Sequence, residues 1–448
     1  MTTIIVGGGC AGLAAAHTMT KHGAEVLILE KEADPGGRMR TYKQDGFLMD
    51  MGAQYVHPGY KVARELMADV GMIGELGDIP MNNIQMFRDG KWYYPQPYGS
   101  TMERLRTQRW RTKFGVNGLR GLQRMTDFVL ARAPQIYEGS VDWFMDMESE
   151  WFGDFVKREY GSEVLEYFVQ PVISAITFAE PEDIGMGFGL QIMWTILCGR
   201  AAVPKRGIGS LAEALVAEAA ANNIAIKGGT PVEQIVIEKG KVKGVTTPDG
   251  FIDADTVICA TTATKALSIM PDLPDTLRGP LSRVTYTPIV NAMVAVDKLM
   301  SAEGSAGGVL PRRAAIPISF IGFNSARSRG LAPDGCDSIN CFIYGKHAYT
   351  MFDKSDEEIT RRMVAYLQEL VSRMPKKILF SKIARWTEAN YLMAPGTCAA
   401  VKNMRDNHYR DVEGLFLCGE YMYTGAYESA LAAGQAAAQA ALGMRESI

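Results

Sequence analysis

The start of the chain, up to Glu30, constrains the fold of these 448 residues more than any other segment. Thr3–Val6 is apolar and leads into Gly7-Gly8-Gly9-Cys10-Ala11-Gly12, a helix-like run follows, and a second apolar stretch ends at Glu30. Glycines let backbone N–H groups approach a pyrophosphate, and the start of a helix presents partial positive charge to it. Glu30 falls where a carboxylate can accept hydrogen bonds from ribose hydroxyls. The pattern predicts a Rossmann-type α/β domain that binds a dinucleotide.

A second motif follows directly, in Glu30–Arg38 and Phe47–Tyr55. These stretches resemble the second signature of the flavin amine oxidase superfamily, which includes protoporphyrinogen oxidases and phytoene-type desaturases. The resemblance implies that the dinucleotide is FAD. Gly36 and Gly37 would permit another close backbone approach, and Arg38 can place a guanidinium beside the pyrophosphate or the flavin.

Two later segments resemble the rest of the same frame. Gly414–Glu420 is a short apolar stretch that ends in a glycine and a carboxylate, and Thr424–Ala430 opens an alanine-rich helix. This resembles the family's terminal FAD motif, in which a helix N-terminus can stabilise negative charge on a reduced flavin. Thr230–Ile237 resembles the middle segment, where Val232 would contact the adenine side. The matches have the right order and span nearly the whole chain.

The resemblance implies a set of residues that contact FAD: Gly7, Gly9, Cys10, Ala11, Gly12, Glu30, Lys31, Gly36, Gly37, Arg38, Gly52, Ala53, Gln54, Tyr55, Val232, Gly419, Glu420, Ala426 and Tyr427. Cys398 lies near the segment where some relatives attach flavin covalently, but the usual sequence context is missing, so a plain buried thiol is predicted. FAD binding is therefore expected to be non-covalent.

Length and composition agree with this assignment. A chain of 448 residues exceeds one ordinary domain. The expected FAD-binding domain comprises residues 1–60, 205–265 and 385–448, interleaved with a mixed α+β substrate-binding domain of residues 61–204 and 266–384. Of the latter segments, the first has mainly helical periodicity and the second has strand-like alternation.

Charge and cysteine content limit the partners that are expected. The formal net charge of −3 gives no reason to expect a nucleic-acid partner. Seven cysteines without a C-x-x-C pair indicate reduced thiols and no metal site. With the first strand starting at Thr3 and no apolar run of about eighteen residues, a cytoplasmic protein is predicted, peripheral to a membrane at most.

One segment, residues 104–124, is strongly basic. Its cations are Arg104, Arg106, Arg109, Arg111, Lys113, Arg120 and Arg124, with Trp110 and Phe114 among them. It could bind a membrane surface or an anionic substrate, or it could be a solvated helix face or a homodimer contact. The second interpretation is favoured, because charge runs are commonly solvated.

The reaction is less constrained than the cofactor. By eye, Asn291 occupies the strand position where amine oxidases commonly have a lysine, and Ala426 replaces an aromatic ring that flanks the substrate nitrogen. Val203–Leu211 and Trp386–Gly396 resemble protoporphyrinogen oxidases and carotenoid-type desaturases. The leading hypothesis is hydride transfer from a hydrophobic or cyclic carbon substrate, such as a cyclic ketone or carboxylate, a porphyrinogen or a polyene, to flavin N5. Oxidation of a primary or secondary amine and a non-catalytic FAD-binding protein remain alternatives.

Residues on the substrate side can also be named. Tyr55 and His57 follow the second motif, and His57 could accept a proton if its pKa lies near the working pH. Trp386, Tyr391, Tyr421 and Tyr423 are candidate walls of the pocket, and Arg312 and Arg313 could attract a substrate carboxylate. Oxygen or a quinone is the expected electron acceptor for this small-molecule oxidation.

Overall fold

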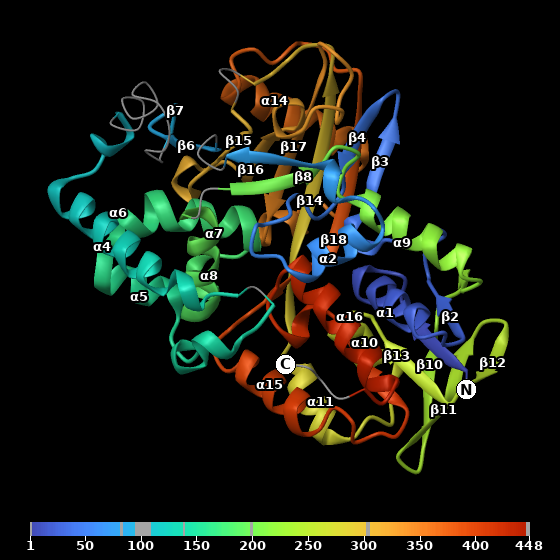
Figure 1. Ribbon diagram of the computed structural model, residues 1–448. Coiled ribbons are helices and arrows are strands. Elements are labelled where there is room, and N and C mark those ends of the chain that lie inside the picture. The colour runs from blue at the N-terminus through green and yellow to red at the C-terminus, as the bar shows by residue number, and fades with distance from the viewer. Residues whose placement is uncertain are drawn as a thin grey trace.

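The computed structural model describes residues 2–80, 84–94, 109–137, 139–197, 200–301 and 305–444 (Figure 1). It has the predicted α/β class, with a parallel sheet beside a larger mixed sheet. Arg104 and Arg106 of the basic segment lie outside the described residues.

The parallel sheet has five strands in the order β19-β13-β1-β2-β9. They are β1 (Thr3–Val6), β2 (Val26–Leu29), β9 (Ala225–Lys227), β13 (Thr256–Cys259) and β19 (Leu415–Leu417). Every residue of β1 is buried, as expected for a central strand covered on both faces. These strands come from the beginning, middle and end of the chain, so three distant segments form one cofactor-type sheet.

Helices α1 (Cys10–Lys21) and α16 (Tyr427–Ala441) pack tightly beside this sheet (Figure 1). A Cβ on Gly434 would lie 2.0 Å from the backbone oxygen of Ala11, so only glycine allows this approach. The close packing joins the first and last helices of the chain. Helix α9 (Gly209–Ala221) also packs against α1.

The mixed sheet has seven strands in the order β18-β14-β17-β16-β15-β6-β7. Their bounds are β6 (Ile84–Arg88), β7 (Lys91–Tyr93), β14 (Thr285–Val296), β15 (Gly307–Val309), β16 (Ile318–Phe323), β17 (Asp337–Tyr344) and β18 (Phe380–Leu392). β18 continues past residue 385, where the FAD-binding domain was expected to resume, and stays in this sheet. The exact domain boundaries therefore remain a prediction.

The long strand β14 shows why this sheet has two different faces. Val290, Ala292 and Val294 belong to a hydrophobic cluster with α14 (Asp356–Leu370), whereas Ile289 and Asn291 line a cavity on the opposite face. Alternate residues of a strand point to opposite faces of its sheet. One face of the sheet thus packs against α14 in a hydrophobic cluster, and the opposite face borders the candidate site.

The structure also describes several small sheets and further helices. Smaller sheets are formed by β3 (Thr41–Gln44) with β4 (Phe47–Asp50), by β5 (Leu76–Pro80) with β8 (Arg200–Pro204), and by β10 (Gln234–Glu238), β11 (Lys241–Thr247) and β12 (Gly250–Asp253). The remaining helices are α2 (Val62–Asp69), α4 (Val116–Arg132), α5 (Phe152–Tyr160), α6 (Ser162–Val164), α7 (Gln170–Thr177), α8 (Met186–Leu197), α10 (Ala263–Ile269), α11 (Asp275–Ser282), α12 (Asn324–Arg327), α13 (Lys346–Tyr349) and α15 (Thr397–Asn407). Helices α4 to α8 form a cluster beside the mixed sheet (Figure 1).

Candidate active site

The glycine-rich turn between β1 and α1 has the geometry that a pyrophosphate site needs. Gly7 has a φ of +104°, which is the left-handed region, and a Cβ on Gly12 would lie 1.9 Å from the backbone oxygen of Gly7. A Cβ on Gly9, in contrast, would meet no protein atom within 4 Å. The space in front of Gly9 is therefore open at the N-terminus of α1, where an anion is stabilised.

Glu30 lies at the end of β2 and is 7 % exposed. Its Oε2 accepts a hydrogen bond from the N–H of Gly8 at 2.7 Å, and its Oε1 accepts from the N–H of Glu32 at 2.9 Å. A carboxylate has about four lone-pair sites, so acceptor capacity remains for ribose hydroxyls. Lys31 is exposed and lies 3.6 Å from the Glu32 carboxylate, and Val232 is buried.

We expect Glu30→Ala to weaken FAD binding by about tenfold or more, because it removes a charge-assisted hydrogen bond worth roughly 1.5–3 kcal/mol. Glu25→Ala, which removes an exposed carboxylate directly before the same strand, is the matched control and should bind FAD normally. Fluorescence titration of the apoproteins with FAD measures both dissociation constants. Equal dissociation constants for Glu30→Ala and the wild type would show that Glu30 does not hold the ribose.

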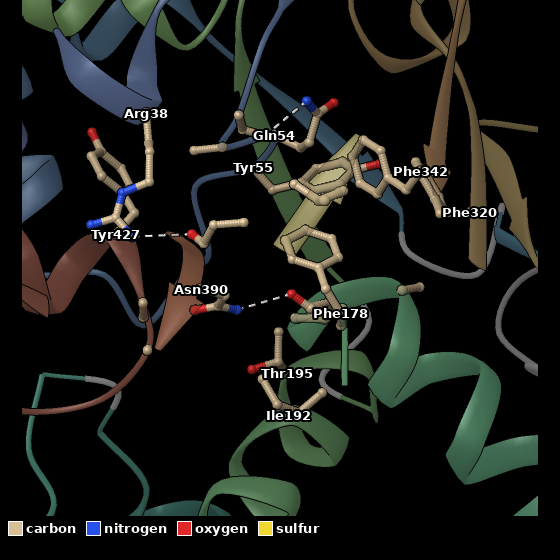
Figure 2. A pocket seen from close by; sticks show the side chains of 18 of the residues that line it. Arg38, Gln54, Tyr55, Phe178, Ile192, Thr195, Phe320, Phe342, Asn390 and Tyr427 are labelled. Carbon is tan, nitrogen blue, oxygen red and sulfur yellow. Dashed lines mark hydrogen bonds between the residues drawn. The ribbon is translucent and has the colours of Figure 1, made fainter. Parts of the chain in front are cut away.

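Arg38 joins the two ends of the chain at the site. Its Nη2 donates to Glu420 Oε2 at 2.6 Å, and its Nη1 donates to the backbone oxygen of Ala389 at 3.1 Å (Figure 2). Burial lowers the pKa of Arg38, but the charge of Glu420, the hydrogen bond to Glu420 and the charges of Tyr286 and Cys10 together outweigh burial and raise that pKa above its usual value. Arg38 and Glu420 form an ion pair in which the opposite charges offset each other.

A cavity of about 250 Å³ extends from this pair toward the mixed sheet (Figure 2). On the cofactor side it is lined by Cys10, Arg38, Gly52, Ala53, Gln54, Tyr55, Glu420, Gly425, Ala426, Tyr427 and Ala430. On the far side it is lined by residues of α7, α8 and six strands of the mixed sheet, including Ile84, Met86, Val172, Ile176, Phe178, Phe188, Gln191, Ile192, Thr195, Ile289, Asn291, Val309, Phe320, Phe342, Trp386 and Asn390. The cavity thus connects the predicted cofactor site to a largely apolar chamber.

Aromatic rings form one wall of this chamber. The ring centroids of Phe178 and Phe342 are 5.6 Å apart, and those of Phe320 and Phe342 are 5.2 Å apart. Tyr55 points toward the same group of rings (Figure 2). Aromatic pairs at such distances stabilise one another and present a large apolar contact surface.

The charges in the cavity lining are few. Among the described residues that line it, Arg38 and Glu420 carry charge, and each neutralises the other. Burial lowers the pKa of His57 to about 4, so its ring is neutral at ordinary pH. The condition under which His57 could accept a proton, a pKa near the working pH, is therefore not met.

Of the predicted substrate-side residues, Tyr55, His57 and Trp386 line the cavity. The Trp386 Nε1 donates to the backbone oxygen of Met51 at 2.9 Å, which fixes the indole. Tyr391 is absent from the described lining: it is 1 % exposed, and its hydroxyl lies 3.8 Å from Cys398 Sγ. Tyr421 and Tyr423 also lie outside that lining.

Asn291 and Ala426 both line the cavity. That they occupy the positions where the amine-oxidase pattern has a lysine and an aromatic ring stays a prediction from the sequence. The Asn291 Nδ2 donates to the backbone oxygens of Asp50 at 3.1 Å and Met51 at 3.2 Å. Its amide is thus bonded to the protein backbone. Ala426 precedes the first residue of α16 and contributes a methyl group, and no ring of its own, to the cavity lining.

The suggestion that Arg312 and Arg313 attract a substrate carboxylate is wrong for this structure. Arg312 donates hydrogen bonds to Glu166 and Glu182, and Arg313 donates to Glu166. Neither arginine lines the described cavity. Both guanidinium groups are therefore already hydrogen-bonded to carboxylates of the protein itself.

The basic segment divides between core and surface. Trp110 and Phe114 are buried, while Arg109, Arg111, Arg120 and Arg124 are exposed. None of these described cations lines the cavity, so an anionic-substrate role inside it has no support. No helix in the described ranges is long and apolar enough to cross a membrane, and no described cluster of acidic, histidine and cysteine side chains could hold a metal ion.

Sequence reasoning did not single out Phe178, Phe320, Phe342, Gln191 or Asn390. Phe320 and Phe342 lie on strands whose residues are all buried, so alternation of polar and apolar residues gives no sign of which face holds the cavity. Asn390 is a polar residue in β18 whose Nδ2 donates to the backbone oxygen of Ile176 at 3.1 Å (Figure 2). β18 also contains Ser381, Lys382, Arg385, Thr387 and Glu388, so the presence of one more polar residue gave no sequence signal for the site.

The residues present fit an FAD. Besides the open turn at Gly9, two buried polar atoms next to the cavity, Glu420 Oε1 and the Tyr427 hydroxyl, have no hydrogen-bond partner within the described chain. Buried polar atoms are normally paired, so these atoms indicate a missing polar partner. The flavin and its ribityl chain carry donors and acceptors that would supply one.

Comparison with known proteins agrees with this geometry. Protoporphyrinogen oxidase 2 of Arabidopsis thaliana is 23% identical over 195 residues, which are 43% of this chain and 35% of that protein. Coproporphyrinogen III oxidase of Bacillus subtilis is 22% identical over 457 residues, covering 93% of this chain and 92% of that protein. The structure of cyclohexylamine oxidase from Brevibacterium oxydans has the same fold, with a TM-score of 0.73 at 17% identity over 98% of both chains. Residues 10–442 match the model of the flavin containing amine oxidoreductases, and the chain belongs to that family.

Proposed function

We propose that this flavin-dependent oxidoreductase binds FAD non-covalently and dehydrogenates a hydrophobic, cyclic or polyene carbon substrate. The observation that carries the proposal is the lining of the cavity, which is aromatic and aliphatic and whose described charges, Arg38 and Glu420, neutralise each other. Among the described residues of this lining, an ammonium ion would find no carboxylate that lacks a cationic partner. Taking an unpaired charge out of water costs several kcal/mol.

Two cysteines bear on the mode of cofactor binding. Burial raises the pKa of Cys10 to about 12 and that of Cys398 to about 12, so both are neutral thiols at ordinary pH. The thiolate is the reactive form of cysteine. A covalent link between either sulfur and the flavin is therefore disfavoured, which supports non-covalent binding.

The division of labour in the reaction follows from the position of each group. When bound, FAD supplies the acceptor for a hydride equivalent from the substrate carbon. The turn at Gly7–Gly12 and Glu30 would hold its pyrophosphate and ribose, and the Arg38–Glu420 pair would lie beside the flavin. The rings of Phe178, Phe320 and Phe342 would hold the substrate and exclude water. The proposed electron acceptor is oxygen or a quinone.

The alternative, oxidation of an amine, is favoured by the description of the family itself. Two positions count against it: Asn291, whose amide nitrogen is bonded to backbone oxygens, and Ala426, which provides no ring to flank an amine. The relatives that match over most of this chain include a coproporphyrinogen oxidase. Carbon dehydrogenation is therefore the better-supported reaction.

Binding of matched ligands tests the proposal. Cyclohexanone and cyclohexylamine have rings of the same size, but the amine is protonated at neutral pH. We expect the ketone to perturb the spectrum of bound FAD with a dissociation constant at least about 100-fold lower than that of the ammonium form, because a few kcal/mol of desolvation is not offset. Equal or tighter binding of the ammonium ion would favour the amine oxidase.

The pH dependence of the reaction tests the state of His57. With a pKa lowered to about 4 by burial, His57 stays neutral from pH 5 upward. The rate of flavin reduction should therefore show no inflection from this residue between about pH 5 and 8, and His57→Gln should leave the shape of the pH profile unchanged. An inflection near neutral pH that disappears in His57→Gln would show that His57 titrates during the reaction.

A further inference from the structure

The segment Met51–Tyr55 forms a continuous part of the cavity wall, since all five of its residues line the cavity. It follows β4 and contains no helix or strand. Its backbone is tied on one side to the first FAD motif, because the N–H of Met51 donates to Arg40 O and the N–H of Ala53 donates to Arg38 O. A second set of contacts holds the opposite side of the segment.

That other side is held by side chains of the mixed sheet. The oxygen of Asp50 accepts from Asn291 of β14 at 3.1 Å and from Asn340 of β17 at 3.3 Å. The oxygen of Met51 accepts from Trp386 of β18 at 2.9 Å. Strands β14 and β18 thus bond Met51, the first residue of the segment, and strands β14 and β17 bond Asp50, the residue directly before it.

Arg327 of α12 holds the far end of the segment. Its Nη2 donates to the backbone oxygen of Gln54 at 2.6 Å, and its Nη1 donates to Gln54 Oε1 at 2.5 Å. The guanidinium also lies 4.7 Å from the centre of the Tyr55 ring. Gln54 and Tyr55 are therefore fixed by a side chain that is itself outside the described cavity lining.

A further asparagine links these contacts to each other. Asn324 Nδ2 donates to Asn340 Oδ1 at 2.7 Å, and Asn324 Oδ1 accepts from Arg327 at 2.6 Å. Asn291, Asn324, Asn340 and Arg327 are at most 2 % exposed. Each of these four side chains makes hydrogen bonds to other buried groups, and such bonds restrict its motion.

We propose that Asn324, Asn340 and Arg327 are positioning residues, which fix the position of Met51–Tyr55 relative to the flavin and the substrate. Asn324 and Asn340 do not line the described cavity, so they act through the segment. The inference rests on the proposed function in that this cavity is the reaction chamber. A misplacement of about 1 Å in a reaction chamber can slow a reaction about 100-fold.

The test compares Asn340→Leu with a variant that loses stability elsewhere. Met363→Ala removes a fully buried side chain of α14 on the opposite face of the sheet. Hydrogen–deuterium exchange of the peptide that contains Met51 and Ala53 should become at least about tenfold faster in Asn340→Leu and stay unchanged in Met363→Ala. Asn340→Ser, which leaves room for a water molecule, provides the same comparison if the leucine variant does not fold.

Two further readouts come from the FAD-loaded protein. In Asn340→Leu the absorption spectrum of bound FAD should shift, and its reduction by saturating substrate should slow by about 10- to 100-fold, with FAD affinity nearly unchanged. Unchanged exchange and an unchanged spectrum, or the same changes in Met363→Ala, would overturn the positioning role. If no substrate reduces the wild type, the proposed function fails, but exchange and the spectrum still decide this inference.

Discussion

Arg327→Met should lower the free energy of unfolding by about 3–5 kcal/mol at neutral pH, the usual cost of removing one partner of a buried ion pair. The Arg327 side chain is fully buried, and its Nη2 lies 3.9 Å from Asp50 Oδ2. Burial raises the pKa of Asp50, and the nearby Arg327 opposes that rise. Without Arg327, the buried Asp50 would lose its nearby positive charge and keep only the hydrogen bonds from Thr41 and the N–H of Ile208. Gln54 O and Asn324 Oδ1 would each lose a hydrogen bond.

The loss of stability in Arg327→Met should depend on pH in a defined direction. In Arg327→Met the folded-state pKa of Asp50 rises further above its unfolded value, so the folded state binds the extra proton. The loss of stability should therefore be smallest at acidic pH and should grow as the pH rises through that folded-state pKa. Urea unfolding at several pH values measures it.

A surface arginine provides the matched control. Arg206 donates two hydrogen bonds to Glu75, but its side chain is 57% exposed. An exposed pair contributes at most about 1 kcal/mol, so Arg206→Met should have a small effect. If Arg327→Met destabilised the protein no more than Arg206→Met does, the buried network would not have the energetic role assigned to it.

Gly9→Ala should weaken FAD binding by about 10- to 100-fold without changing the stability of the apoprotein, since forcing one carbon into a packed site costs about 1–3 kcal/mol. Gly9 has an extended backbone that alanine adopts, and its Cβ would meet no protein atom within 4 Å. The added methyl group would instead occupy the space proposed for the pyrophosphate.

Two other glycines make this result interpretable. Gly12→Ala would place a Cβ 1.9 Å from Gly7 O, so it should damage both the apoprotein and the cofactor site. Gly74→Ala meets nothing within 4 Å and should change neither. The measurements are thermal unfolding of the apoproteins and the flavin released by acid precipitation of the loaded ones. Normal FAD content in Gly9→Ala would place the pyrophosphate elsewhere, and flavin retained in the wild-type pellet would contradict non-covalent binding.

The cofactor half of the site could be predicted from the sequence because its constraints are local. The turn at Gly7–Gly12 and the carboxylate of Glu30 are fixed by spacing within one βαβ unit, and the structure places them in that order. The spacing of residues in the sequence could not predict the open space at Gly9, because that space depends on how other parts of the chain pack around the turn.

The substrate half depends on contacts between distant segments. Arg312 pairs with Glu166 and Glu182, which are 146 and 130 positions away, and no local pattern predicts that pairing. Trp386 and Asn390 of β18 line the described cavity, and Tyr391, which is one position out of phase with them, does not, in keeping with the alternation of side chains along a strand. The sequence alone did not show which of the two alternating sets of β18 side chains faces the cavity.

Anaerobic reduction of the bound flavin by carbon substrates and by amines tests the central claim most directly. A stopped-flow experiment would mix the FAD-loaded protein with a panel of cyclic ketones, porphyrinogens and polyenes and, separately, with primary and secondary amines. We expect rapid bleaching of the flavin by at least one carbon substrate, slower bleaching when deuterium replaces the transferred hydrogen, and little reduction by the amines. Rapid reduction by an amine, with no response to any carbon substrate in the panel, would contradict this claim.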